Sequence, residues 1–320
     1  MYRVMAFSFD NLPINPLVGA DSATFDRVTS GVEIDHLARF RATKICQRVL
    51  NPLYQVNNRI YDRANLQKIV SPLFILGHWR SGTTLLHNLL AEDAQFCYCT
   101  TYQTIFPHLM IRGSSVMRHL AALAMPHSRP KDHQILSISQ PQEEEFAIAN
   151  TTTSAYYHFW IFPRLMPYYR TRFLSFEGAS NAELEEFCSA LRRVMQVTLY
   201  CSGKSRFLSK NPPNTARIPI LLRLFPDAKF VYIHRNKSDV LRSTKEFVRR
   251  TTDAIALQKV SPEWLDNEVE KTYNELISRY NRDKYLIPQG SLCEISFAEL
   301  TTQGKSTINR IYSCLGLKRQ

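Results

Sequence analysis

The stretch SPLFILGHWRSGTTLLHNLL, residues 71–90, decides the fold that we expect for this chain. Its apolar run from Pro72 to Leu76 is typical of a buried strand. A helix is predicted from about Gly82, with leucines on one face: Leu85, Leu86, Leu89 and Leu90. The loop between them aims backbone N–H groups and a positive helix end at an anion. The stretch therefore predicts a strand, a phosphate-binding loop and a helix in succession.

This loop departs from the nucleotide-hydrolase signature G-x-x-x-x-G-K-[ST]. Gly77 and Gly82 have the required spacing and Thr84 takes the Ser/Thr place, but Thr83 stands where the lysine is expected. The cation lies inside the loop instead, at Arg80. Because the lysine normally reaches the β- and γ-phosphates beside a magnesium ion, its loss argues against triphosphate cleavage. A shorter phosphate that carries a transferable group suits the loop better; a turn without a ligand is the alternative.

Composition favours a polyanionic ligand. The 320 residues include 40 Lys+Arg against 28 Asp+Glu, a net charge of +12, and the length suits one large α/β domain. No basic tail is present and aromatic residues do not alternate with basic ones, so nucleic-acid binding is not predicted. The seven cysteines form no CxxC pair, which predicts reduced thiols and neither a disulfide framework nor a zinc site.

The chain shows no segment that we expect to cross a membrane. No apolar run approaches the length of a transmembrane helix, and the first residues do not resemble a secretory signal. We therefore expect a cytoplasmic protein. Residues 1–65 are predicted to be a lead-in and a helical extension packed on the main domain, with a helix over residues 33–58 that is interrupted near Pro52.

Residues 66–320 are predicted to form one α/β domain with a substrate-binding insertion at about 100–170. Strands are expected at 96–100, 206–209, 228–234 and 291–297, with the clearest helix at 180–203. Strands that alternate with helices give a three-layer α/β/α fold around a central parallel sheet. In the insertion, Pro141 is predicted to start a helix, and the aromatic run 155–169 is interpreted as core or pocket wall.

Two further strand ends carry cations. Lys210 follows the strand at 206–209, and Arg235 follows the strand at 228–234, with Ser243 eight residues later. Because ligands collect outside the carboxyl ends of parallel strands, we expect Arg80, Lys210 and Arg235 to converge. An arginine fork and a hydroxyl placed in this way suit a terminal phosphate.

These motifs together resemble the PAPS-dependent sulfotransferases, over about residues 71–317. The run Arg80, Ser81, Gly82, Thr83 and Thr84 looks like their 5′-phosphosulfate loop. Arg235 and Ser243 match the pair that holds the 3′-phosphate of PAPS, and the surrounding segment resembles the tyrosylprotein and bacterial carbohydrate-type branches. The resemblance implies a fold like that of P-loop nucleotide hydrolases, PAPS as the sulfuryl donor and no required metal.

The resemblance also implies roles for individual residues. Lys210, together with Arg80, would contact the sulfuryl group or the leaving phosphate during in-line transfer. Where the tyrosylprotein branch has its catalytic glutamate, this chain has Thr101, so the general base is predicted from the PQEEEF segment of the bacterial branch. The candidates are Glu143 and Glu145, with His87 as the fallback.

Several points stay open at the level of sequence. The acceptor is a hydroxyl or an amine, in a sugar, a lipid headgroup or a small alcohol. The oligomeric state is not predicted, and the way in which the C-terminus closes over the cofactor is in doubt. The alternative functions are a P-loop small-molecule kinase and a non-catalytic scaffold that binds phosphate or anionic glycans.

Overall fold

A computed structural model describes residues 14–62, 68–111, 138–204 and 206–320. The structure contains a five-stranded sheet in the order β2-β3-β1-β4-β5, and every pairing within it is parallel. The strands are β1 Leu73–Leu76, β2 Phe96–Cys97, β3 Arg206–Lys210, β4 Lys229–His234 and β5 Leu292–Ser296. The predicted strands are therefore confirmed, although the one expected at 96–100 is shorter.

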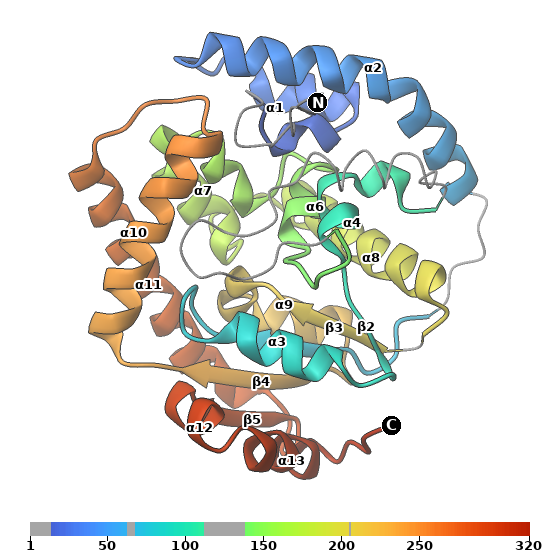
Figure 1. Ribbon diagram of the computed structural model, residues 1–320, viewed down its shortest axis with the longest axis vertical. Helices are drawn as coiled ribbons and strands as arrows, with labels where there is room; N and C mark the ends of the chain where they lie inside the picture. The colour runs from blue at the N-terminus through green and yellow to red at the C-terminus, as the bar shows by residue number, and fades with distance from the viewer. Residues whose placement is uncertain (1–13, 63–67, 112–137, 205) are drawn as a thin grey trace, which may run out of the picture.

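Helices of the main domain connect and cover these strands (Figure 1). The longer ones are α3 Thr83–Ala91, α8 Asn181–Ser202, α9 Ile218–Leu224, α10 Lys237–Ile255, α11 Pro262–Asp283, α12 Phe297–Thr302 and α13 Gly304–Leu315. The α8 helix is bounded as the sequence predicts. Ser180 and Glu183 form a capping box at its start, and Gly203 adopts the left-handed conformation at its end.

Alternation along the strands divides the core into two layers. Leu73 and Ile75 of β1 pack with the leucines of α3 and the apolar face of α13, whereas Phe74 and Leu76 pack on the opposite side, in the cluster of α8 and α11. Strand β4 alternates in the same way: Val231 and Ile233 pack in the first layer, and Phe230 and Tyr232 in the second. Because successive side chains of a strand point to opposite faces, this pattern gives the predicted three-layer α/β/α arrangement.

The segment between β2 and α8 is built from short helical pieces. They are α4 Thr101–Ile105, η3 Pro107–Leu109, α6 Glu145–Ala149, η4 Tyr156–Trp160, η5 Pro163–Leu165, α7 Met166–Tyr169 and the π-helical turn η6 Arg170–Leu174. The helix predicted to start at Pro141 begins instead at Glu145, so Glu143 lies in the loop before it. The aromatic run is buried, as predicted.

The N-terminal part packs on this segment through η2 Pro16–Gly19, α1 Ser22–Thr29 and α2 Leu37–Asp62. The predicted break near Pro52 is wrong, because α2 continues through that residue. Of the apolar residues in the predicted helix, Leu37, Ile45 and Val49 are exposed. The buried face carries Thr43, Gln47, Tyr54, Asn57 and Tyr61 instead.

Candidate active site

The loop between β1 and α3 has a strained backbone that only particular residues permit. Gly77 and Gly82 have φ angles of 144° and 106°, and a Cβ atom at Gly82 would lie 2.4 Å from Cδ2 of Phe297. Arg80 adopts φ 65° without being a glycine. Such a left-handed residue costs free energy and persists where the surroundings hold it in place, often at functional sites.

Neighbouring elements hold this loop from two sides. The Gly77 amide donates to Oγ1 of Thr215 at 2.8 Å, and Oγ of Ser81 donates to the His78 carbonyl at 2.7 Å. On the other side, Oγ1 of Thr244 in α10 donates to the Trp79 carbonyl at 3.3 Å. The conformation of the loop is therefore fixed by one hydrogen bond within it and by two with residues far away in the sequence.

The structure brings the predicted phosphate-binding residues together. Nε of Arg80 donates to Oγ of Ser243 at 3.0 Å, and a guanidinium nitrogen of Arg235 lies 3.4 Å from the Arg80 carbonyl oxygen. Arg235 also stacks over the Phe297 ring at 4.7 Å and pairs weakly with Asp239 at 3.7 Å. Two guanidinium groups and a hydroxyl therefore meet where β1 and β4 end.

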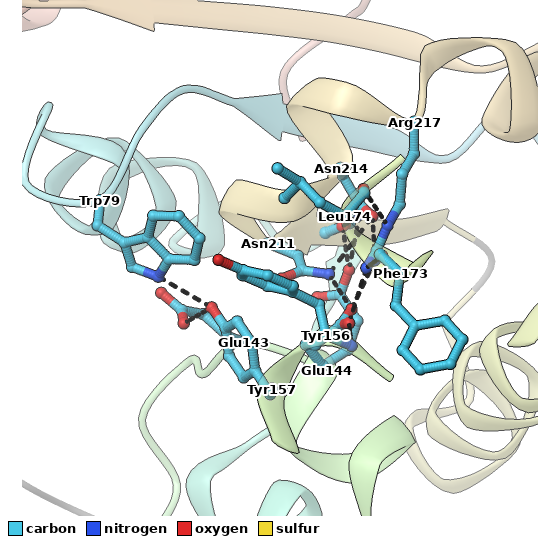
Figure 2. Close-up of polar contacts among 12 residues, drawn as sticks. Trp79, Glu143, Glu144, Tyr156, Tyr157, Phe173, Leu174, Asn211, Asn214 and Arg217 are labelled. Atoms are coloured by element: carbon cyan, nitrogen blue, oxygen red, sulfur yellow. Dashed lines mark hydrogen bonds and ion pairs between the residues drawn. The ribbon is translucent and has the colours of Figure 1, made fainter. Parts of the chain in front are cut away.

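Lys210 lies at the end of β3, beside a carboxylate that the sequence placed among the candidate bases. Its ammonium group is 2.5 Å from Oε1 of Glu143, and both side chains are mostly buried. The Tyr157 hydroxyl donates to the other oxygen of Glu143, and Nε1 of Trp79 donates to Tyr157 at 3.0 Å. Figure 2 shows Trp79 and Tyr157 directed towards each other beside Glu143. A hydrogen-bonded chain thus runs from the phosphate loop to Lys210.

Burial, together with the Glu143 carboxylate, raises the pKa of Tyr157 well above its ordinary value. The phenol therefore stays protonated and acts as a donor to Glu143 at neutral pH. Neither Trp79 nor Tyr157 was singled out by the sequence patterns. Trp79 lies within the phosphate-binding loop and Tyr157 within the aromatic run, and neither pattern carries a signal for the polar atom of the side chain.

The second candidate base, Glu145, forms a buried ion pair that stabilises the fold. Its two oxygens accept from both terminal nitrogens of Arg217, at 2.7 and 2.9 Å, and from Asn211 at 2.7 Å. Arg217 and Glu145 are fully buried, and Arg217 also donates to the carbonyls of Phe173 and Leu174 (Figure 2). A carboxylate held in this way has no access to an acceptor, so the geometry does not favour Glu145 as the base.

His87 is buried on α3, against the ring of Tyr98. Burial first, and the nearby charge of Lys210 second, hold the pKa of His87 well below its ordinary value. Its ring is neutral, but it is enclosed by the core of the domain. Thr101, at the position of the glutamate of the tyrosylprotein branch, is buried at the start of α4.

Glu144, between the two candidates, is buried and hydrogen-bonded to side chains at and after the end of β3. Its Oε1 accepts from Oγ of Ser209 and from Asn214 at 3.2 Å. Burial raises the pKa of Glu144 to about 7. Removal from water is the chief cause of this raised pKa, and the charge of the adjacent Glu145 adds less.

Among the described residues, no group of three or more His, Cys, Asp or Glu side chains lies together as metal ligands do. No helix in the described ranges is long and apolar enough to cross a bilayer. No disulfide joins any two cysteines of the described residues.

The sequence and the fold of this chain resemble those of known proteins. A family model described as "Sulfotransferase family" matches residues 72–320. Two mycobacterial proteins, from Mycobacterium bovis and Mycobacterium tuberculosis, are both described as omega-hydroxy-beta-dihydromenaquinone-9 sulfotransferase Stf3. Each is 32% identical over 260 residues, which cover 81% of this chain and 66% of the relative. The match therefore spans slightly less than two thirds of the length of these relatives.

Two solved structures share the fold. Sulfotransferase STF1 from Mycobacterium tuberculosis H37Rv gives a TM-score of 0.69 at 18% identity, over 97% of this chain and 84% of that one. Sulfotransferase STF9 from Mycobacterium avium gives 0.66 at 17% identity, over 99% and 86%. The predicted sulfotransferase fold is confirmed.

We expect the substitution Arg217→Met to lower the free energy of unfolding by about 3–5 kcal/mol, because it leaves the Glu145 carboxylate buried without its partner. Urea unfolding of the purified protein measures this change. The matched control is Arg250→Met, which removes an exposed pair with Glu246 on the surface of α10 and should cost at most about 1 kcal/mol. Equal effects of the two substitutions would contradict the structural role of Arg217.

The raised pKa of Glu144 predicts a pH-dependent stability. Between its ordinary value of 4.5 and about 7, the folded state binds more protons than the unfolded chain. The free energy of unfolding therefore falls as the pH rises through this window. We expect Glu144→Gln to be more stable than the wild type by about 3 kcal/mol near pH 8, and similar to it near pH 4. Urea unfolding at both pH values measures this, with the exposed Glu92→Gln as control; a constant difference would contradict the prediction.

Proposed function

Because the chain belongs to the sulfotransferase family, we propose that it transfers a sulfuryl group from PAPS to a hydroxyl group of an apolar acceptor. The observation that carries the proposal is that cations follow the carboxyl ends of three neighbouring strands, β3, β1 and β4. Arg80 and Arg235 lie at the ends of β1 and β4, and the pair of Lys210 and Glu143 lies at the end of β3.

In this proposal the two sides of the site bind different parts of the donor. The 5′-phosphosulfate is held at the positive start of α3. The groups that bind it are the backbone amides of the loop and the residues Ser81, Gly82, Thr83 and Thr84. Arg235 and Ser243 bind the 3′-phosphate, for which a guanidinium fork and a hydroxyl are suited. Arg80, hydrogen-bonded to Ser243, would link the two phosphate sites.

The reaction proposed here is an in-line displacement at sulfur. The acceptor oxygen forms a bond to sulfur while the bond from sulfur to the bridging oxygen of PAPS breaks, and adenosine 3′,5′-bisphosphate leaves. Lys210 and Arg80 stabilise the negative charge that grows on the bridging oxygen. Glu143 takes the proton of the acceptor hydroxyl, and Tyr157 holds the carboxylate in position by donating to its other oxygen.

The aromatic side chains around Glu143 support an acceptor with an apolar body. Phe146 lies against Tyr157 with ring centroids 4.7 Å apart, and Trp79 and Phe159 lie near the same ring. The two mycobacterial relatives carry the name of an omega-hydroxylated dihydromenaquinone. We propose an acceptor of similar chemical kind for this chain, in which a hydroxyl terminates an otherwise apolar molecule.

The same proposal assigns the parts of the chain. Residues 66–320 would form the catalytic domain, residues 100–170 would bind the acceptor, and residues 1–65 would support that segment. We propose a cytoplasmic location, for which the sequence pattern is the support: the seven cysteines include no CxxC pair, as is typical of reduced thiols. A kinase is disfavoured because Thr83 stands at the position of the phosphate-binding lysine.

We expect Arg235→Ala to weaken the binding of adenosine 3′,5′-bisphosphate by about 30- to 100-fold, because it removes charge-assisted hydrogen bonds to the 3′-phosphate. Calorimetric titration without added metal measures the affinity. Arg242→Ala is the matched control, since Arg242 lies on α10, the helix that follows Arg235, with its side chain 81% exposed. Tighter binding of ATP with magnesium than of the bisphosphate would instead support a kinase.

We expect Glu143→Gln to lower the rate of transfer by about 10²- to 10⁴-fold, because the amide no longer accepts the proton of the acceptor. Release of adenosine 3′,5′-bisphosphate from PAPS, with a long-chain isoprenoid alcohol as acceptor, measures the rate. Affinity for the bisphosphate should stay within about twofold of the wild-type value. An unchanged rate would assign the base to another residue; loss of affinity alone would make Glu143 part of the donor site.

A further inference from the structure

The α2 helix turns a row of apolar side chains outward and several polar side chains inward, which is the reverse of an ordinary surface helix. Its outer side exposes Ile45, Val49, Leu53 and Val56, which are 64%, 71%, 46% and 52% accessible. A surface helix of a globular protein normally turns such residues inward and its polar residues outward. These four residues follow the spacing i, i+4, i+8 and i+11, so they form one continuous line, which we call the apolar strip.

The polar residues on the inner side of α2 explain why the helix packs this way round. Oγ1 of Thr43 accepts from the Asn15 amide at 3.0 Å, and Gln47 donates to Oγ of Ser22 at 3.2 Å. The Tyr54 hydroxyl donates to the Val18 carbonyl at 2.9 Å. These hydrogen bonds join α2 to η2 and α1, so the orientation of the helix is specified and the apolar strip faces outward as a consequence.

A line of cations runs beside the apolar strip. Arg41, Lys44 and Arg48 follow the spacing i, i+3 and i+7, and Arg59 continues the line. The helix holds five Lys and Arg residues and one acidic residue, Asp62 at its end, a net charge of 5 − 1 = +4. Within the described part of the chain, Arg41, Lys44 and Arg59 form no ion pair with a carboxylate, whereas Arg48 pairs with Asp26.

We infer that α2 docks this protein on an anionic lipid bilayer, with the helix axis parallel to the membrane plane. The apolar strip enters the boundary between headgroups and acyl chains, and the neighbouring cations contact lipid phosphates, as in interfacial amphipathic helices. A second copy of the chain is a poorer occupant. In a two-fold contact the same surface meets itself, and the +4 charge of one helix would face the +4 charge of the other.

The position of α2 is compatible with such docking. The helix runs along one edge of the molecule, on the side away from α12 and α13 (Figure 1). Tyr54 on its inner side packs with Tyr102 and Phe106, which belong to α4 and the residue after it. Docking through α2 therefore brings the segment between β2 and α8 close to the bilayer.

Sedimentation with lipid vesicles tests the inference on the full chain. We expect the wild type to bind vesicles of equimolar phosphatidylcholine and phosphatidylglycerol, and to bind vesicles of phosphatidylcholine alone much more weakly. The triple variant Ile45→Gln, Val49→Gln, Leu53→Gln should bind the anionic vesicles about tenfold more weakly or worse. Arg41→Gln with Arg59→Gln should weaken binding and reduce its dependence on salt.

Two controls separate docking from folding and from catalysis. The double variant Tyr285→Gln, Leu286→Gln removes apolar side chains that are 81% and 57% accessible at η8 and should bind vesicles as the wild type does. All variants should keep the thermal unfolding midpoint and the affinity for adenosine 3′,5′-bisphosphate, because the substituted side chains are exposed and far from that site. Vesicle binding by the triple variant at wild-type strength would overturn the inference. So would a wild-type dimer that the triple variant dissociates, because the strip would then be a contact between copies.

Discussion

The fully buried ion pair of Arg217 and Glu145 is the constraint on which the geometry of the site depends. A buried charge pair is tolerated only when nearly every donor and acceptor in it is satisfied. Here Arg217 meets that demand with the two carboxylate oxygens and the carbonyls of Phe173 and Leu174. The pair thereby fixes α6, η6 and the turn η7 Pro212–Ala216, which directly precedes Arg217, relative to one another. Because Glu143 is two residues from Glu145, its position beside Lys210 follows from this packing.

Three consecutive carboxylates consequently have three different environments. Glu145 is paired with Arg217, Glu144 is enclosed with Ser209 and Asn214 and has a pKa of about 7, and Glu143 lies between Lys210 and Tyr157. If one carboxylate is to act as the general base, the other two must not reach the acceptor. Glu144 and Glu145 are fully buried. The proposed base is Glu143, which contacts Lys210 at the end of β3.

Much of this arrangement was predictable because it is encoded locally. The strand, loop and helix around Arg80, and the capped helix α8, are specified by residues a few positions apart. The approach of Arg235 to Arg80 was predicted from the rule that ligands collect at the carboxyl ends of parallel strands. The roles of Glu143 and Glu145 were not separable from sequence, because the partner of Glu145 lies 72 residues away. An arginine directly before the apolar helix α9 was the available signal.

The inner face of α2 was not predictable for a related reason. The helix predicted over residues 33–58 was expected to pack on the main domain, and its apolar residues Ile45 and Val49 are exposed. Hydrogen bonds between Thr43 and Gln47 and the preceding segment determine the orientation of the helix instead. Tertiary hydrogen bonding of buried polar groups thus outweighs the local pattern.

Transfer of radioactive sulfur from labelled PAPS into a lipid extract tests the central claim most directly. If the charged strand ends form one site for sulfuryl transfer, the purified protein should move the label into a hydroxylated, apolar fraction and release adenosine 3′,5′-bisphosphate in equal amount. Tight binding of PAPS without labelling of any hydroxylated compound would contradict the account, and would identify the chain as a module that binds the nucleotide without turnover.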